Sequence, residues 1–184
     1  FEGKIPNPAE LRTSDLELLE AIKAGFESVG NRIERVELKA ALAEAMRLAS
    51  EVNKYLDVHA PWFEIKTDRA EAEKSLYTAI QAIAWLKIMF APFLPNTCEK
   101  LHQILDSETP LFGSPFTREI SDSLGSHLVL SLDHKDSLAR EGSDVWVAQE
   151  LVGGMPFNQP AVLFKKLDHS IVEEERNRLG NPTA

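Results

Sequence analysis

The sequence has one cysteine, no long apolar run and a shortage of positive charge. The single cysteine, Cys98, excludes an intrachain disulfide, and a zinc site built on it would need three ligands from elsewhere. No apolar segment approaches the ~20 residues that a membrane span requires, and no signal peptide is recognisable. Lysine and arginine number 20 against 29 aspartate and glutamate residues, a formal net charge of −9. This balance argues against a protein that coats nucleic acid through charge alone.

The negative charge is unevenly distributed along the chain. Residues 104–184 carry 13 acidic and 7 basic groups, whereas residues 23–54 carry 5 acidic and 6 basic groups. The acidity therefore lies mostly in the last third, and the front of the chain can still present a locally basic face. The chain begins at Phe1 rather than at methionine, so we expect a piece of a longer protein.

Helical periodicity dominates the first part of the chain. A capping box formed by Ser14 and Glu17 predicts the start of a first helix, which Gly30 would end. A second helix is predicted over about 33–58, because apolar residues recur there at spacings of three and four. The inner stripe of this second helix would consist of Leu38, Leu42, Ala45, Ala49, Val52 and Leu56.

Two further helices complete this helical part. The third is predicted from Asp68, which would cap it together with Glu71, to Phe90. It is apolar over more of its circumference than the others, which predicts the central position in a bundle. A short fourth helix, capped by Asn96, would run to Leu105.

Beyond the fourth helix the periodicity is lost, and glycine, serine and proline become frequent. We expect an irregular segment over 106–160, with a short strand at His127–Leu132, and one more helix at Ser170–Leu179. The predicted fold is therefore all-α. An antiparallel helix bundle over 1–105 would be followed, over 106–184, by an irregular linking segment and a C-terminal helix packed on the bundle.

No pattern of catalytic residues stands out. The five histidines are scattered, and the sequence contains neither a Gly-x-Ser-x-Gly elbow nor a phosphate-binding loop. Cys98 and His102 would share one helical face, but such a pair alone is more often structural. A hydrolase built on the scattered carboxylates and histidines is disfavoured, because no nucleophile–base pair is visible. We therefore expect no catalytic residue and no metal site.

The most informative segment is the end of the second helix, Val52–Phe63. Pro61 would end this helix and shift the preceding residue toward extended geometry, and Trp62 follows in a turn. Trp62 could plug the end of the bundle, as we expect of Trp85 in its middle. Alternatively, Trp62 could be a platform for an unpaired RNA base, since stacking on an aromatic ring contributes about 1–3 kcal/mol per base. Unpaired loop bases are the usual target of sequence-specific RNA readers.

The segment Asn53-Lys54-Tyr55 followed by Ala60-Pro61-Trp62 resembles the anticodon-binding domain of methionyl-tRNA synthetases, which are class Ia aminoacyl-tRNA synthetases. The resemblance extends to Phe1–Pro6, Ala91–Pro95, Trp146, Gly153-Gly154 and Leu163–Asp168, whereas Phe112–Ser143 does not align and resembles an insertion. The sister synthetases for valine, leucine and isoleucine share the bundle. The Ala-Pro-Trp turn and the closing Leu-Phe-Lys-Lys-Leu-Asp peptide favour methionine.

The resemblance implies a small set of RNA-binding residues. Trp62 would stack on the first anticodon base, and Pro61 would set the position of that ring. Asn53 would either hydrogen-bond to the loop or hold the backbone of the turn. Lys54 and Arg47 would contact phosphates or lie over the bundle surface. The expected partner of this set is the anticodon loop of tRNA(Met).

The resemblance also implies what this chain lacks. The family's nucleotide-binding fold, its HIGH and KMSKS signatures and its zinc knuckle are not in the sequence, nor is the helix that precedes Phe1 in the family and supplies an Asn and an Arg to anticodon reading. We therefore expect no cofactor here. ATP and zinc would act in the catalytic part of a parent ligase, and the isolated chain would bind tRNA poorly.

The parent would be a cytoplasmic methionine–tRNA ligase with no membrane partner, and its catalytic domain would be the second partner of this chain. The alternative is a helical protein-interaction bundle without RNA binding, which the net charge of −9 favours. A buried Trp62 in acidic surroundings would support that alternative.

Overall fold

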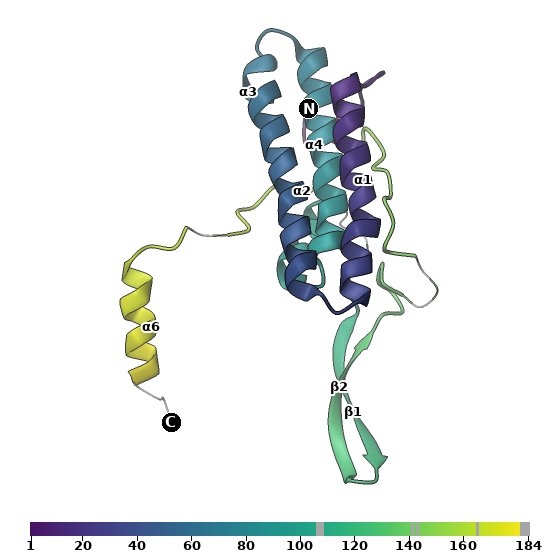
Figure 1. The fold of residues 1–184 in the computed structure, drawn as a ribbon, viewed down its shortest axis with the longest axis vertical. Coiled ribbons are helices and arrows are strands. Elements are labelled where there is room, and N and C mark those ends of the chain that lie inside the picture. Colours follow the sequence, from purple (N-terminus) through teal and green to yellow (C-terminus); the bar gives the residue numbers. More distant parts are fainter. Residues whose placement is uncertain (106–108, 141, 143, 165, 181–184) are drawn as a thin grey trace.

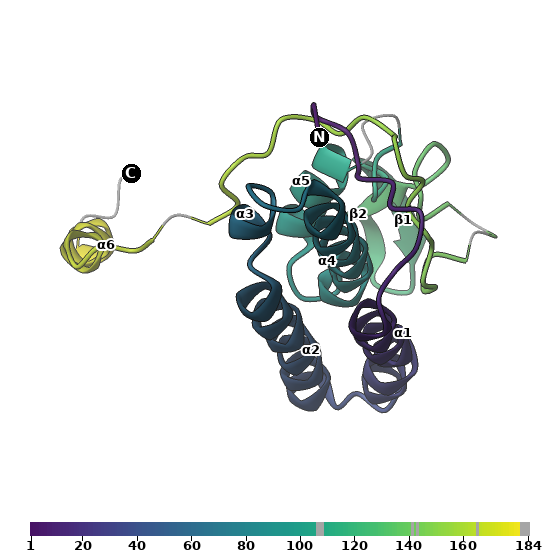
Figure 2. The same cartoon turned by 90° about the horizontal axis from the view of Figure 1, so that it is seen from above.

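Three long helices lie side by side in the computed structural model, which describes residues 1–105, 109–140, 142, 144–164 and 166–180. They are α1 (Thr13–Glu34), α2 (Leu38–His59) and α4 (Arg69–Phe90), and each packs on the other two (Figures 1 and 2). The short α3 (Pro61–Glu64) turns the chain from α2 to α4, and α5 (Pro95–Leu105) packs against α4. The short connections make neighbouring long helices antiparallel, which confirms the predicted helix bundle.

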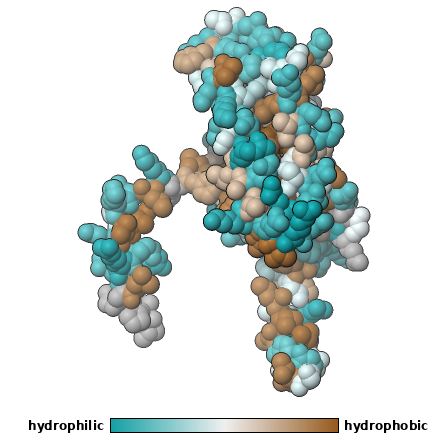
Figure 3. All heavy atoms as spheres, in the orientation of Figure 1, coloured by the Kyte–Doolittle hydropathy of each residue, from teal (hydrophilic) through white to brown (hydrophobic). Residues whose placement is uncertain are grey.

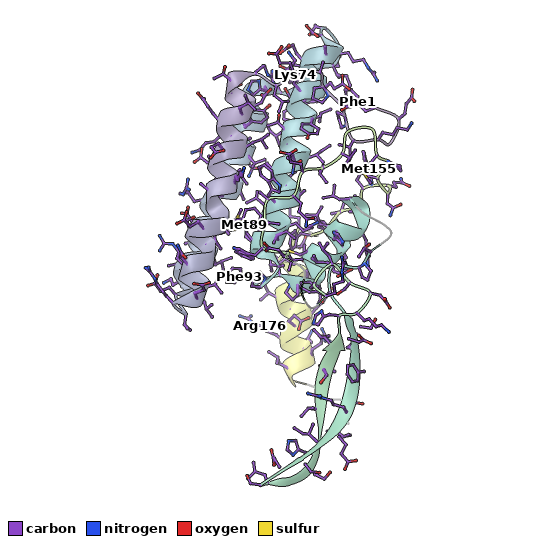
Figure 4. All side chains as sticks on the ribbon, turned by 90° about the vertical axis from the view of Figure 1, so that its right-hand side faces the viewer. Phe1, Lys74, Met89, Phe93, Met155 and Arg176 are labelled. Atoms are coloured by element: carbon purple, nitrogen blue, oxygen red, sulfur yellow. The ribbon has the colours of Figure 1, made fainter. Side chains whose placement is uncertain are left out.

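The central position of α4 is also confirmed. Figure 4 shows α1 and the segment carrying Met155 on opposite sides of α4, so α4 is covered on more than one face. Met89 of α4 is fully buried. Burial of this apolar surface stabilises the bundle. The larger core side chains are Leu18, Ile22, Phe26, Val29, Leu48, Val52, Tyr55, Trp85, Leu86 and Met89.

The buried stripe of α2 differs from the predicted one by a rotation of the helix. Its buried residues are Ala41, Ala45, Leu48, Val52 and Tyr55. The predicted Leu38 is instead 52% exposed and Leu42 is 36% exposed. Two apolar stripes overlap on this helix. The small side chains of Ala41 and Ala45 suit close packing against α1 and α4, and Leu48 and Tyr55 supply the bulk.

The ends of α1 lie elsewhere than predicted. The helix starts at Thr13, and the carboxylate of Asp15 accepts a hydrogen bond of 2.9 Å from the backbone N–H of Arg12, so the predicted box of Ser14 and Glu17 is wrong. Gly30 lies inside the helix rather than at its end. A Cβ atom at this position would lie 2.8 Å from Nε1 of Trp146. Gly30 therefore serves a close approach of the Trp146 ring.

Capping residues and proline set where α4 and α5 begin. The carboxylate of Asp68 accepts hydrogen bonds from the backbone N–H groups of Ala70 (3.0 Å) and Glu71 (3.1 Å), which confirms the predicted N-cap of α4. The fourth predicted helix corresponds to α5, which begins at Pro95 rather than after Asn96. Proline is favoured in a first helical turn because its missing N–H has no partner to lose there.

A β-hairpin is added to the predicted all-α fold. Strand β1 (Ser114–Asp122) pairs antiparallel with β2 (Gly125–Asp133), and the hairpin extends from the lower end of the bundle (Figure 1). The expectation of an irregular segment over 106–160 is therefore wrong at this place. The predicted strand at His127–Leu132 lies within β2. Figure 3 shows hydrophobic side chains on the hairpin surface. Both strands are exposed along almost their whole length, so neither has a buried face that an alternating pattern would mark.

The chain after the hairpin lies against the bundle. The indole N–H of Trp146 donates to the carbonyl oxygen of Phe26 over 2.8 Å, and that of Trp85 donates to the carbonyl oxygen of Gln149 over 2.6 Å. By contrast with the expected packing, α6 (Ser170–Gly180) stands apart from the bundle in two views (Figures 1 and 2). Its side chains are mostly exposed, and they include the apolar Val172 and Leu179.

Some expectations fall on residues that are not described. The predicted domain boundary at 105/106 borders residues 106–108, and Lys165 of the closing peptide is likewise outside the described residues. Within the described ranges, none of the helices combines the length and apolarity needed to cross a bilayer.

The observed packing predicts different costs for two leucines of α2. Leu48→Ala should lower the free energy of unfolding by about 2–5 kcal/mol, because it leaves a cavity in the core. Leu38→Ala, at a 52% exposed position, should change it by less than about 0.5 kcal/mol. Urea denaturation of the two variants measures both values. A larger cost for Leu38→Ala than for Leu48→Ala would mean that the predicted stripe, and not the observed one, faces the core.

Candidate nucleic-acid interface

The turn after α2 presents two aromatic rings to solvent. Ala60 adopts the left-handed conformation, with φ of 41°, rather than the predicted extended one, and Pro61 is buried at the first position of α3. Trp62 is 51% exposed and Phe63 is 64% exposed. Their rings meet edge to face with centroids 6.3 Å apart. Trp62 therefore does not plug the bundle, whereas Trp85, which is 6% exposed, does.

The other predicted residues lie on the exposed surface of α2. The side chain of Asn53 forms no hydrogen bond with the described residues, so it does not hold the backbone of the turn. Lys54 pairs with Glu51 at 3.0 Å, and Arg47 pairs with Glu44 at 2.7 Å. Both basic side chains thus lie along the helix surface, each beside a carboxylate one turn earlier.

Arg12 connects the three long helices at the end that carries the turn. Its Nε donates to both carboxylate oxygens of Asp15, over 3.1 and 3.0 Å. Its Nη2 donates to the hydroxyl of Tyr55 on α2 over 3.1 Å and to that of Ser75 on α4 over 2.7 Å. Its Nη1 reaches Glu71 over 3.2 Å. One guanidinium therefore crosslinks α1, α2 and α4.

Glu64 attaches the aromatic turn to this cluster. Glu64 belongs to α3, the same short helix as Trp62. Its carboxylate accepts a hydrogen bond of 2.7 Å from the hydroxyl of Ser75 and lies 3.5 Å from Nη1 of Arg12. His59 adds a contact from α2, with Nδ1 4.0 Å from the same carboxylate. The backbone that presents Trp62 is thus held from beneath by charged hydrogen bonds.

Burial and pairing set the charges in this cluster. Burial alone would raise the pKa of Asp15, but hydrogen bonds from Arg12 and Tyr55 outweigh it and lower that pKa below its usual value. Burial raises the pKa of Tyr55 to about 12, and its bond of 2.6 Å to Asp15 adds to the rise. At neutral pH the cluster therefore holds an ionised Asp15, a charged Arg12 and a protonated Tyr55.

The sequence alone did not predict that Arg12 and Glu64 support the turn. The actual capping pair is Arg12 and Asp15, which has the same spacing as the predicted pair of Ser14 and Glu17. An acidic residue three positions after Arg12 was therefore the sequence signal for this pair. For Glu64 there is no comparable signal, because its partners Arg12 and Ser75 are far away in sequence.

The surroundings of the turn are not acidic overall. Residues 53–69 contain three basic and three acidic side chains. Two of the acids are bound within the fold. Glu64 contacts Arg12 and Ser75, and Asp68 accepts a backbone hydrogen bond at the start of α4. The condition that would have supported a protein-interaction bundle, a buried Trp62 among acidic groups, is therefore not met.

Cys98 and His102 are both buried residues of α5. Because the Lys87 ammonium can only donate, the 2.8 Å contact makes Nδ1 of His102 an acceptor, and Nε2 then donates to the carbonyl oxygen of Thr109 over 2.8 Å. Burial raises the pKa of the Cys98 thiol to about 11, so it stays protonated. Across the described residues, no cluster of three or more His, Cys, Asp or Glu side chains is arranged to hold a metal ion.

The fold matches that of known aminoacyl-tRNA synthetases. The apo structure of Mycobacterium tuberculosis methionyl-tRNA synthetase superposes with a TM-score of 0.66, at 20% identity, over 91% of this chain and 28% of that chain. A structure of the same enzyme in complex with methionyl-adenylate gives 0.65, over 90% of this chain and 28% of that chain. These likenesses show that this chain shares its fold with about 28% of that chain.

Sequence relatives identify the family. The family described as the anticodon binding domain of methionyl tRNA ligase matches residues 5–124. Methionine–tRNA ligases of Thermomicrobium roseum and Thermobifida fusca are 47% and 39% identical, over 97% and 96% of this chain and 30% and 29% of their own lengths. The chain belongs to the family of methionyl-tRNA ligase anticodon-binding domains, as its motifs indicated. It spans about 30% of the length of these relatives.

Replacing Arg12 should destabilise the bundle strongly. Arg12→Met keeps an apolar stem but leaves the fully buried Asp15 carboxylate without its cation, a loss of about 3–5 kcal/mol. The matched control is Arg47→Met, which removes an exposed ion pair and should cost less than about 1 kcal/mol. Thermal or urea unfolding compares them, and similar costs would contradict the central role of Arg12.

Asp15 should make stability depend on acid. Its pKa is lowered in the folded state, so its contribution is present above the unfolded pKa of about 3.9 and is lost as pH falls through the folded pKa. We expect the free energy of unfolding to decrease on acidification below about pH 4, and to decrease less steeply in Asp15→Asn. Urea titrations at a series of pH values measure the slope. An unchanged slope in the variant would show that other carboxylates carry the acid dependence.

Proposed function

We propose that this chain is the part of a methionine–tRNA ligase that binds the anticodon loop of tRNA(Met), so that the acceptor end of the tRNA reaches a catalytic domain in the same polypeptide. Membership of the anticodon-binding family supports this proposal. The observation that carries it is the half-exposed ring of Trp62 on a turn that Glu64 anchors to Arg12.

In this proposal Trp62 provides the stacking surface. A flat aromatic ring accepts any base, so stacking supplies affinity rather than sequence discrimination. Pro61 fixes the backbone just before the ring, since its own φ is locked and it is buried. The turn therefore loses little conformational entropy when a base stacks on it, which favours binding.

Asn53 is the proposed reader of a base edge. Its amide offers both donors and acceptors, and no described group occupies it. A site that hydrogen-bonds the right base leaves polar groups unpaired with a wrong one, and this penalty discriminates between bases. Lys54 remains a predicted phosphate contact, although its pairing with Glu51 would have to be broken or shared.

Activity belongs to the proposed parent enzyme. The Mycobacterium tuberculosis relative has been solved bound by methionyl-adenylate, which supports methionine activation by that protein. For this chain, aminoacylation with ATP, zinc in a catalytic part and a cytoplasmic location are extensions of the proposal. The sister synthetases are disfavoured as parents, because the matched family and the relatives named above are specific to methionine.

Trp62→Ala should weaken recognition of tRNA(Met). The loss of one stacking surface predicts a decrease in binding free energy of about 1–3 kcal/mol. In the intact ligase we expect a higher KM for tRNA, with no change in the KM for methionine or in the rate of adenylate formation. Steady-state charging kinetics and pyrophosphate exchange measure the two sets of values.

The matched control for Trp62→Ala is Phe116→Ala, which removes a comparably exposed aromatic side chain from the hairpin. It should leave the KM for tRNA unchanged. If Trp62→Ala also leaves charging unchanged, Trp62 is not part of the anticodon site and the site assignment fails.

A further inference from the structure

Lys66 follows the aromatic turn and lies over one of its rings. Its Nζ is 5.5 Å from the centroid of the Phe63 ring. The other neighbour of that ring is Trp62, at 6.3 Å and an interplanar angle of 64°. The ammonium group, the phenyl ring and the indole therefore form one continuous exposed surface. Figure 1 places α3, from which this surface extends, at the end of α2 remote from the hairpin.

The basic side chains near the turn differ in whether a carboxylate already neutralises them. Lys54 has Glu51 at 3.0 Å and Arg47 has Glu44 at 2.7 Å. Lys66 has no carboxylate within 4.0 Å among the described residues. An RNA phosphate approaching Lys54 or Arg47 competes with an existing ion pair, whereas one approaching Lys66 does not.

The acids closest to Lys66 in sequence are directed elsewhere. Glu64 is bound to Arg12 and Ser75 in the cluster under the turn. Asp68 accepts two backbone hydrogen bonds at the start of α4. Folding therefore uses both negative charges that flank Lys66 and leaves its positive charge on the surface beside the rings.

A lysine stacked on an aromatic ring is well suited to a phosphate. The cation–π contact holds the ammonium in place, and its three N–H donors remain available to oxygen acceptors. Proteins that bind single-stranded nucleic acid combine such charges with aromatic stacking surfaces, because each nucleotide presents both a phosphate and a base.

We propose that Lys66, supported by Phe63, contacts a phosphate of the RNA strand whose base stacks on Trp62. Lys66, rather than Lys54 or Arg47, is then the main electrostatic contact of this turn. The inference rests on the proposed function, since it requires that an RNA loop binds at Trp62.

The test compares Lys66→Gln with Lys54→Gln in the intact ligase. The probe is an anticodon stem-loop RNA of tRNA(Met), and its Kd is measured by fluorescence titration between about 50 and 200 mM salt. Removing one phosphate contact to a single strand should reduce the slope of log K against log salt by about 0.7. We expect this reduction, and weaker binding at low salt, for Lys66→Gln, and a smaller reduction for Lys54→Gln, whose ammonium is already paired with Glu51.

Two further measurements make the result specific to a phosphate. Lys66→Arg keeps the charge and should keep the wild-type slope. A stem-loop with an altered anticodon should lose affinity through Lys66→Gln by the same factor as the matched stem-loop, because phosphate contacts do not read sequence. Circular dichroism of Lys66→Gln checks that the fold is intact, as expected for an exposed side chain.

The outcomes separate this inference from the proposed function. If Trp62→Ala weakens binding but Lys66→Gln leaves the salt slope unchanged, or if Lys54→Gln reduces it equally, the assignment of Lys66 is wrong and the anticodon site stands. If Trp62→Ala has no effect on binding, the site itself is wrong, and the inference fails with it.

Discussion

The guanidinium of Arg12 is the contact on which the end of the bundle that carries Trp62 depends. Asp15 is fully buried and ionised, and a buried carboxylate without a cation is strongly destabilising. Arg12 must therefore lie between α1, α2 and α4, and from there it also reaches Glu64 of α3. The backbone that carries Trp62 is positioned by the same group that closes the helix bundle.

In the proposed function, this arrangement separates stability from recognition. The core holds Trp85, which is buried and hydrogen-bonded to the carbonyl oxygen of Gln149. Trp62 is half exposed, and its surroundings combine the Phe63 ring with the ammonium of Lys66, which has no carboxylate partner in the part of the chain that the structure describes. The excess negative charge of the chain does not prevent this, because its acids lie mostly in the last third and those of the turn are used inside the fold.

The sequence predicted those features that depend on neighbouring residues. The existence of the long helices, the Asp68 cap and the proline-directed turn all follow from local spacing. The errors arose where distant contacts decide. Gly30 was predicted to end the helix, because the residue that requires a glycine there, Trp146, lies far along the chain. In α2, two overlapping apolar stripes competed, and only packing against α1 and α4 selected the buried one.

By itself, the sequence determined the helix-bundle class, the family and the presence of an aromatic turn at residues 60–63, because these depend on periodicity and on a short motif. Only the tertiary structure decided that Trp62 faces solvent, that Glu64 is bound to Arg12, and that Arg12 thereby anchors the turn. The exposure of Trp62 and the pairing of Arg12 with Glu64 depend on which distant side chains meet, and no local pattern encodes those meetings.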